Sequence, residues 1–398
     1  MLQHYKKLTI LSLVLFCSFT LAGCWSNRDL AEFAIISAIG IDKADDYNIE
    51  LTLQIVNSSQ MKTGESSGGS SPIKPVTTIS LTGNTIADAL SKTSKNIDKI
   101  PFLSDVNIII IGEELARDGI VDYLDFFERY SYSKRRAYLL IAKDLKAKEV
   151  LKSVSSMDKI PANHMVHIMK NSKYSGRVRT QTVIELIQTI EKPGQDDVVG
   201  TVKLSREDGT FDVNNLCFEG GSIIKDGKLI GWLDSDETLA LLIIKEKLKN
   251  FFFTIPDPVW DSKKATVEVL SVKTKIKTAA EEDQPKYTVD TSIIANMTEI
   301  QAKVYEITPE YWTDLENQLR KAVGTLIKDT IKKAQNQYQS DIFGFCEDLR
   351  IKNPKLWKKT IENWDDVFKD CPVDVNVKVI LKRPSVIKQP LKIREKGD

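Results

Sequence analysis

Cys24 is the residue of this chain whose chemistry is easiest to define, because a thiol at this position can be acylated. It follows an apolar run from Leu8 to Leu21 that is preceded by Lys6 and Lys7. A basic start, an apolar middle and a small-residue end form the layout of a secretory signal peptide. The run is shorter than the roughly 18 to 20 residues that a membrane-crossing helix needs. We therefore expect residues 1–23 to be a signal peptide rather than a permanent span.

The residues at the expected cleavage point, "LAGC" from Leu21 to Cys24, resemble the lipobox of bacterial lipoproteins. In such proteins the thiol receives a diacylglycerol, the chain is cut between the residues that correspond to Gly23 and Cys24, and the new amino group can be acylated. Two acyl chains anchor far more durably than one, at about 0.8 kcal/mol per buried methylene. We predict an S-diacylglycerol, N-acyl cysteine at Cys24. The alternative is a chance cysteine after an ordinary signal peptide or short anchor.

Two histidines, His164 and His167 in "PANHMVHIMKN", are the only ones in the processed chain. Their spacing places both on one face of a helix, where they could bind a metal ion. A site needs further ligands, and neither these nor an HExxH pattern accompany the pair. We expect an ordinary surface helix and no metal.

Catalytic motifs give no support for an enzyme. The chain has no GxSxG, no Walker loop and no dinucleotide-binding glycine pattern, and "FEGGS" lacks the strand and helix context of such motifs. Carboxylates are plentiful, as in "DSDE" and "WDD", but 28% of the chain is charged. A catalytic acid pair stays open; the prediction is a non-enzymatic protein without a cofactor.

Besides Cys24, three cysteines remain after processing: Cys217, Cys346 and Cys371. They show no CxxC or CxxH spacing, which argues against a redox motif or metal ligation. A disulfide between Cys346 and Cys371 is one option, and three free thiols are the other.

The charge balance of the processed chain is close to neutral. Removing residues 1–23 takes away Lys6 and Lys7 and no acidic residue, so 54 basic and 55 acidic residues remain, a net charge of −1. This balance gives no reason to expect a nucleic acid as partner. No later stretch approaches 18 uninterrupted apolar residues. A soluble body on a lipid tether is expected.

The first part of the body, residues 24–195, mixes strand and helix patterns. Apolar runs on either side of "DKADD" predict a hairpin, and residues 60–75, rich in Gly and Ser, predict a flexible loop. The continuous apolar run from Val106 to Ile111 predicts a strand buried on both faces. We expect an α+β domain that ends near "KPGQDD".

The remainder changes character. Residues 196–300 are mostly alternating strands, with a hairpin turn at Lys225 to Gly227, and predict a β-rich middle domain. Residues 301–398 predict a third domain of helices and one strand, and a sheet common to the last two domains is one option. The expected fold class is therefore α+β, with three domains, mixed and antiparallel sheets, and packed helices.

The last domain contains the longest amphipathic pattern. Thr308 and Pro309 predict a helix start. Its apolar stripe comprises Trp312, Leu315, Leu319, Val323, Leu326, Ile327 and Ile331. Further on, Trp357, Ile361 and Trp364 lie at helical spacing and are interpreted as a core face, with an exposed docking patch as the alternative. The final strand alternates at Val373, Val375, Val377 and Val379.

Four stretches in order resemble the C-subunit lipoproteins of spore germinant receptors, the Ger(x)C family. They are "GCWSNRDLAEFAIISAIGID", "FLSDVNIIIIGEELARDGI", "FEGGSIIKDGKLIGWL" and "DIFGFCEDLRIKNPKLWKK". They spread over residues 24–379. Two features depart from the family pattern: Cys346 stands where glycine is expected, and the tail after "VILKRPSV" lacks the usual basic ending.

The resemblance implies a non-enzymatic subunit that acts in nutrient-triggered spore germination. Such a lipoprotein is held at the outer face of the spore inner membrane and works with an integral-membrane A subunit and a permease-like B subunit. The family is understood to have three α+β domains. It supplies no motif for contact with the germinant, so the ligand-binding residues are unknown. The alternatives are a solute-binding lipoprotein of a transporter and, third, a cell-envelope hydrolase.

Overall fold

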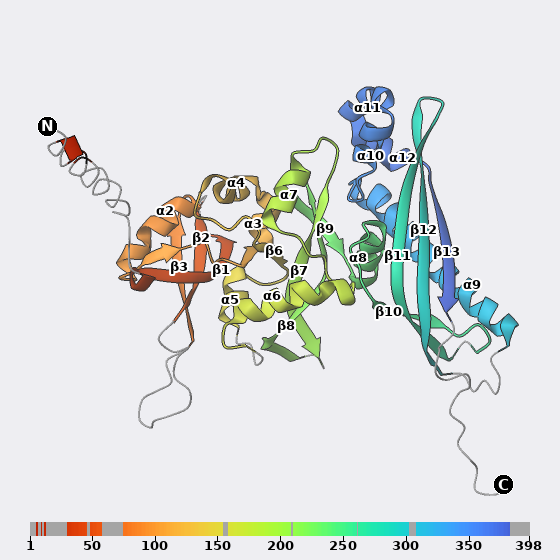
Figure 1. Ribbon diagram of the computed structural model, residues 1–398, viewed down its shortest axis with the longest axis horizontal. Helices are drawn as coiled ribbons and strands as arrows, with labels where there is room; N and C mark the ends of the chain where they lie inside the picture. The colour runs from red at the N-terminus through yellow and green to blue at the C-terminus, as the bar shows by residue number, and fades with distance from the viewer. Residues whose placement is uncertain are drawn as a thin grey trace, which may run out of the picture.

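The computed structural model describes residues 30–45, 48–57, 75–153, 158–207, 210–260, 262–301 and 308–382, and the single positions 5, 6, 9 and 12. Two β-sheets, each with helices packed against it, lie side by side in an elongated body (Figure 1). The predicted α+β class with mixed and antiparallel sheets is confirmed. Across these described ranges, no helix has the length and apolar character to cross a membrane.

The first sheet has nine strands in the order β3-β2-β1-β5-β6-β7-β8-β9, with β4 paired to β1. The central strands β1, β5, β6 and β7 run parallel to one another, and the flanking pairs are antiparallel. The strands are β1 (Phe33–Lys43), β2 (Ile49–Val56), β3 (Val76–Gly83), β4 (Ile100–Phe102), β5 (Ile108–Gly112), β6 (Tyr138–Ala142), β7 (Asp197–Glu207), β8 (Thr210–Lys225) and β9 (Lys228–Leu233).

Both faces of this sheet are covered, which confirms the prediction for the strand after Val106. Ile109 and Ile111 join an apolar core on one face, whereas Ile108 and Ile110 join a second core on the other. Successive side chains of a strand point to opposite faces, so a continuous apolar run serves both cores. The covering helices are α2 (Ile86–Ser91), α3 (Glu113–Asp118), α4 (Val121–Arg129), α5 (Ala147–Lys152), α6 (Pro161–Asn171) and α7 (Val183–Ile190).

The sheet continues past the boundary that the sequence predicts at residue 195. The "KPGQDD" turn leads directly from α7 into β7, and β7 pairs in parallel with β6 through Leu140 and Gly200. Strands β7, β8 and β9 therefore extend the first sheet instead of beginning another. The division into three domains stays a prediction.

The second sheet has the order β10-β11-β12-β13. Its strands are β10 (Phe251–Pro256), β11 (Lys264–Glu281), β12 (Gln284–Ile300) and β13 (Val373–Lys382), and the last joins β12 in parallel. The helix α9 (Pro309–Lys333) crosses one face of this sheet (Figure 1). The other helices of this half are α8 (Ser235–Ile244), α10 (Phe345–Lys352), α11 (Pro354–Thr360) and α12 (Trp364–Asp370).

The long helix begins where the sequence predicts. Thr308 Oγ1 accepts a hydrogen bond from Tyr311 N at 3.2 Å, which satisfies one of the free N–H groups of the first turn. The predicted stripe packs into the core of this half, with Leu326 only partly buried. Five short helical turns complete the described elements: η1 (Leu30–Glu32), η3 (Lys92–Lys95), η4 (Ser172–Tyr174), η5 (Ala334–Tyr338) and η6 (Ile361–Asn363).

Candidate functional site

Several residues singled out in the sequence have no described surroundings. Gly23 and Cys24 lie outside the described residues, as does the 60–75 segment apart from Pro75. The lipid attachment at Cys24 and the cleavage before it stay predictions.

The two histidines lie on α6, His164 partly exposed and His167 exposed. Among the residues that the structure describes, no three His, Cys, Asp or Glu side chains are grouped to hold a metal ion. No further ligand for the pair is found among these described residues.

The three cysteines are free thiols, so the optional disulfide between Cys346 and Cys371 is not formed. Cys346 Sγ donates to Pro193 O at 3.4 Å, and Cys371 Sγ donates to Phe368 O at 3.3 Å. Burial raises the pKa of both thiols to about 12. At neutral pH such thiols are protonated and unreactive.

The helical tryptophans belong to the core, as predicted. Trp364 is buried, and Trp357 and Ile361 pack partly buried against the same cluster. In the other aromatic stretch, Phe251 is buried, whereas Phe252 and Trp260 are 56% and 42% exposed.

A charged cavity of about 490 Å³ lies at the carboxyl ends of β1, β5 and β6. We call it the strand-end pocket. Ligands of open α/β sheets commonly bind at this edge. Its lining residues are Asp42, Lys43, Gly112, Glu113, Glu114, Leu115, Arg117, Asp144, Leu145, Lys146 and Glu149.

Asp42 is the buried centre of the strand-end pocket, with 2% exposure. Its Oδ1 accepts from Ala147 N at 2.7 Å and its Oδ2 from Lys148 N at 2.9 Å, at the start of α5. Burial raises the pKa of Asp42, and these two N–H donors oppose that shift. Negative charge at a helix start is favourable, so the carboxylate ties β1 to α5.

Two other carboxylates of this pocket, Glu113 and Glu149, also have backbone or side-chain partners. Glu113 forms an ion pair with Arg117 at 2.7 Å and accepts from Asp144 N at 3.1 Å. Glu149 accepts from Lys146 N at 2.7 Å. The described lining residues include no Ser, Thr, Cys or His. The lining thus consists of charged side chains together with Gly112, Leu115 and Leu145.

A second polar centre joins the first sheet to the second half. Asp341, only 1% exposed, accepts four hydrogen bonds from the turn that starts α10. The donors are the N–H groups of Phe343, Gly344, Phe345 and Cys346, at 3.2, 2.9, 3.1 and 2.7 Å. Gly344 adopts a φ of 90°, which favours glycine.

The chain around Asp341 reaches back to the first sheet. Asp196 N donates to Asp341 O at 3.1 Å, and Ser340 Oγ donates to Asp196 Oδ2 at 2.7 Å. Lys225, in β8, donates to Gln339 O at 2.5 Å. Burial raises the pKa of Asp196 to about 7. The two halves are thus joined by a titratable contact.

A buried ionic cluster lies next to this junction. Asp197 Oδ1 lies 3.5 Å from Arg179 and 3.6 Å from Lys245, and Oδ2 accepts from Gln181 at 2.6 Å and Thr189 at 2.9 Å. Burial alone would raise the pKa of Asp197, but the two cations and the hydrogen bonds lower it. Paired burial of this kind is the condition under which charges are tolerated inside a protein.

The four stretches that carry the resemblance meet in the structure. Asp42, from the first, occupies the space beside Gly112, from the second. Ile120 N, at the end of the second, donates to Gly227 O of the third at 2.8 Å. Lys225 of the third stretch donates a hydrogen bond to Gln339 O, which lies just before the fourth stretch. These stretches form a continuous series of contacts through the body.

Sequence reasoning missed the buried charges Asp42, Asp341 and Asp197 and the mostly buried Lys245. For the first two a signal existed, because each ends or begins an apolar segment within a stretch that resembles the family. Nothing local distinguishes Asp197 or Lys245 from the many exposed charges of the chain.

Comparison with known proteins covers nearly the whole chain. Residues 26–204 match the family described as "Spore germination protein N-terminal domain". Residues 219–385 match "Spore germination B3/ GerAC like, C-terminal".

Full-length relatives agree with these matches. "Spore germination protein KC" of Bacillus subtilis (strain 168) is 28% identical over 410 residues, covering 99% of this chain and 100% of the relative. "Spore germination protein B3" of the same organism is 27% identical over 384 residues, covering 94% and 98%.

A solved structure has the same fold. The chain in "Crystal Structure of the GerBC protein" matches with a TM-score of 0.52 and 23% identity, over 86% of this chain and 96% of that one. With two family matches in the expected order, relatives similar from end to end and a shared fold, the chain belongs to the Ger(x)C family of spore germination proteins.

Proposed function

We propose that the chain is the lipid-anchored, non-enzymatic subunit of a nutrient germinant receptor. Cys24 carries the acyl anchor, at the outer face of the spore inner membrane, and the partners are an integral-membrane A subunit and a permease-like B subunit. The observation that carries the proposal is the match to spore germination families over both halves of the chain. The "LAGC" sequence supports the anchor.

The geometry of the strand-end pocket supports the non-enzymatic role. Asp42, Glu113 and Glu149 each accept a hydrogen bond from a backbone N–H group of a neighbouring loop or helix start. These bonds account for the three carboxylates as groups that position the chain, which favours the non-enzymatic role over the cell-envelope hydrolase.

The sheets argue against the solute-binding lipoprotein. Such a protein would be built from two similar lobes, whereas the first sheet has nine strands around a parallel centre and the second has four in a different order.

The anchor is tested with Cys24→Ala and, as a matched control in the signal segment, Cys17→Ala. We expect the first variant to lose labelling by radioactive palmitate, to leave the membrane fraction and to germinate poorly with nutrients, while the second behaves as the parent. Normal acyl labelling of Cys24→Ala would show that the anchor lies elsewhere.

The receptor role is tested by deleting the gene and by purifying the tagged protein from detergent-solubilised spore membranes. We expect slower germination with at least one nutrient and co-purification of two multi-span membrane proteins. Unchanged germination with every nutrient, together with purification of the chain alone, would contradict the proposal.

A further inference from the structure

The outer edge of β13 is open. This strand is the last in the order of the second sheet and pairs on one side only, with β12. No other strand within the described ranges lies on its free side. An unpaired edge presents a row of N–H and C=O groups that can take up another strand.

Three hydrogen bonds show which peptide groups face outward. At the start of the strand, Pro372 O accepts a hydrogen bond from Tyr287 N of β12 at 2.9 Å. The N–H and C=O groups of the even-numbered residues of β13 therefore point toward β12. At its end, Leu381 N donates to Glu316 Oε1 at 2.8 Å, and Leu381 O accepts from Trp312 Nε1 at 3.0 Å. The backbone N–H and C=O groups of Leu381, an odd-numbered residue, therefore point away from β12, and side chains of α9 cover them.

The same alternation sets the direction of the peptide groups between Pro372 and Leu381. Peptide groups of a strand point alternately to its two sides, so those of Val375, Val377 and Val379 face the open edge. Within the described part of the chain, none of these outward groups has a hydrogen-bond partner comparable to those of Leu381. The edge is covered at one end and open along its middle.

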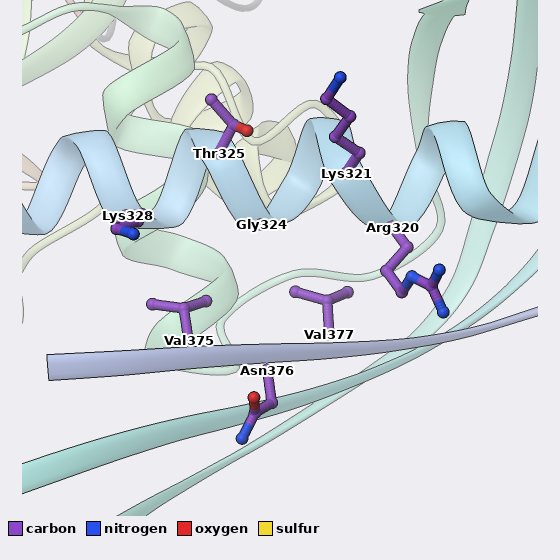
Figure 2. A pocket seen from close by; sticks show the side chains of 8 residues that line it. All are labelled: Arg320, Lys321, Gly324, Thr325, Lys328, Val375, Asn376 and Val377. Carbon is purple, nitrogen blue, oxygen red and sulfur yellow. The ribbon is translucent and has the colours of Figure 1, made fainter.

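A groove of about 380 Å³ runs beside this open stretch, between α9 and β13. Val375 and Val377 point toward the helix, while Arg320 extends toward the strand and Lys321 points away from it (Figure 2). Gly324 has no side chain to fill the groove. A Cβ at this position would lie 3.7 Å from Val377 Cγ2, at ordinary contact distance, and would occupy part of the space between α9 and β13.

The groove is positively charged. Its helix side carries Arg320, Lys321 and Lys328. In the described ranges none of the three forms an ion pair with a carboxylate, and Arg320 donates only to the neutral Asn317 Oδ1, at 2.8 Å. Uncompensated cations beside an open strand edge, Arg320 and Lys328 above all, favour a negatively charged occupant.

We propose that the free edge of β13 and this groove receive an extended acidic segment of a partner protein, which adds a strand to the sheet. The backbone of the segment pairs with Val375, Val377 and Val379, and its acidic side chains enter the groove beside Arg320 and Lys328. Main-chain bonds supply affinity and alternate side chains supply specificity in this mode of recognition.

Charge argues against two other occupants. The C-terminal segment 383–398 contains five basic and two acidic residues, a net charge of +3. A second copy that paired through its own β13 edge would bring the same cations against this groove. Like charges placed opposite each other oppose pairing. An anionic membrane surface would satisfy the cations, but it has no peptide groups to pair with a strand edge. The proposal rests on the second sheet alone and does not depend on the proposed function.

The test uses the full chain in detergent and fluorescent peptides of about ten residues, enough to span roughly 33 Å of strand. One peptide alternates Glu and Thr, and its control alternates Lys and Thr. A third carries N-methyl groups on alternate residues of the Glu peptide, in both possible phases. The protein variants are Arg320→Glu with Lys328→Glu, and Lys332→Glu as the matched control on an exposed part of α9 outside the groove.

We expect the Glu peptide to bind and the Lys peptide not to bind. One phase of N-methylation and the double variant should each weaken binding by about tenfold or more, and Lys332→Glu by less than about twofold. Equal binding of the Lys peptide, no effect of N-methylation in either phase, or no binding at all would overturn the proposal. Displacement of the Glu peptide by phosphatidylglycerol micelles but not by phosphatidylcholine micelles, with N-methylation having no effect, would identify a lipid-headgroup site instead.

Discussion

Asp42 and Gly112 lie at the ends of neighbouring parallel strands, and the Asp42 carboxylate fills the space in which a side chain at residue 112 would begin. The same carboxylate accepts the first N–H groups of α5. Two sequence stretches that are 70 residues apart are therefore fixed to each other and to a helix by one buried group.

Gly112→Ala is expected to destabilise the protein. Its Cβ would overlap Asp42 Oδ1, which cannot move away without losing the hydrogen bond from Ala147 N. Overpacking of this kind costs about 1–3 kcal/mol in the free energy of unfolding. Urea denaturation followed by circular dichroism measures the change.

Gly324→Ala serves as the control for this substitution. Its Cβ would make an ordinary contact at 3.7 Å, and alanine is favoured over glycine inside a helix by about 1 kcal/mol. We expect this variant to be as stable as the parent or more so. Equal destabilisation by the two substitutions would show that the Asp42 contact is not the cause.

Asp197→Ala is expected to cost about 3–5 kcal/mol in the free energy of unfolding, because it leaves the buried Arg179 and the mostly buried Lys245 without their anion. The double variant Asp197→Ala with Lys245→Met should recover part of the loss, which denaturation curves would reveal. Asp366→Ala, at an exposed carboxylate of α12, is the control and should change stability by less than about 0.5 kcal/mol. No recovery in the double variant would contradict the ionic explanation.

The junction between the halves should be sensitive to pH through Asp196. Burial raises its pKa to about 7, against about 3.9 for an unfolded aspartate. The folded chain therefore holds a proton that the unfolded chain has released, and the stability from this group falls as pH rises from about 4 to 7. The charge of Lys225 lowers the pKa of Asp196, and the charges of Asp341 and Asp226 raise it, each by less than burial does.

Asp196→Asn isolates this effect, since its amide oxygen can still accept from Ser340. We expect the variant to gain stability relative to the parent as pH rises through this window, by at most about 1.4 kcal/mol per pH unit. Above about pH 7.5 the free energies of unfolding of the two proteins should change with pH in parallel. Thermal unfolding at a series of pH values provides the measurement. Parallel profiles from pH 4 to 8 would refute the assignment.

The thiols should react in a defined order with Ellman's reagent. Cys217 is partly exposed, whereas Cys346 and Cys371 are buried and their pKa is raised to about 12. We expect Cys217 to react first and the other two only on unfolding. The denatured chain should give the same thiol count with and without prior reduction. A higher count after reduction would reveal a disulfide.

Local patterns determined much of the fold. The hairpin around "DKADD", the doubly buried strand before Gly112 and the capped helix from Thr308 all depend on periodicity and turn chemistry within a few residues. These signals are local, so a single sequence contains them. The order of the four family-like stretches, together with "LAGC" at Cys24, also came from the sequence alone.

The tertiary structure decided what lies beyond local spacing. The sequence placed a boundary at residue 195, but β7 pairs with β6, because strand pairing depends on edges brought together by the intervening helices. In the sequence nothing distinguishes Asp197 and Lys245 from exposed charges, whereas the fold brings them together away from solvent. The open edge of β13 follows from its position as the last strand of the sheet, which only the assembled sheet defines. Pairing partners and burial are properties of residues far apart in the chain, and for that reason no local pattern contains them.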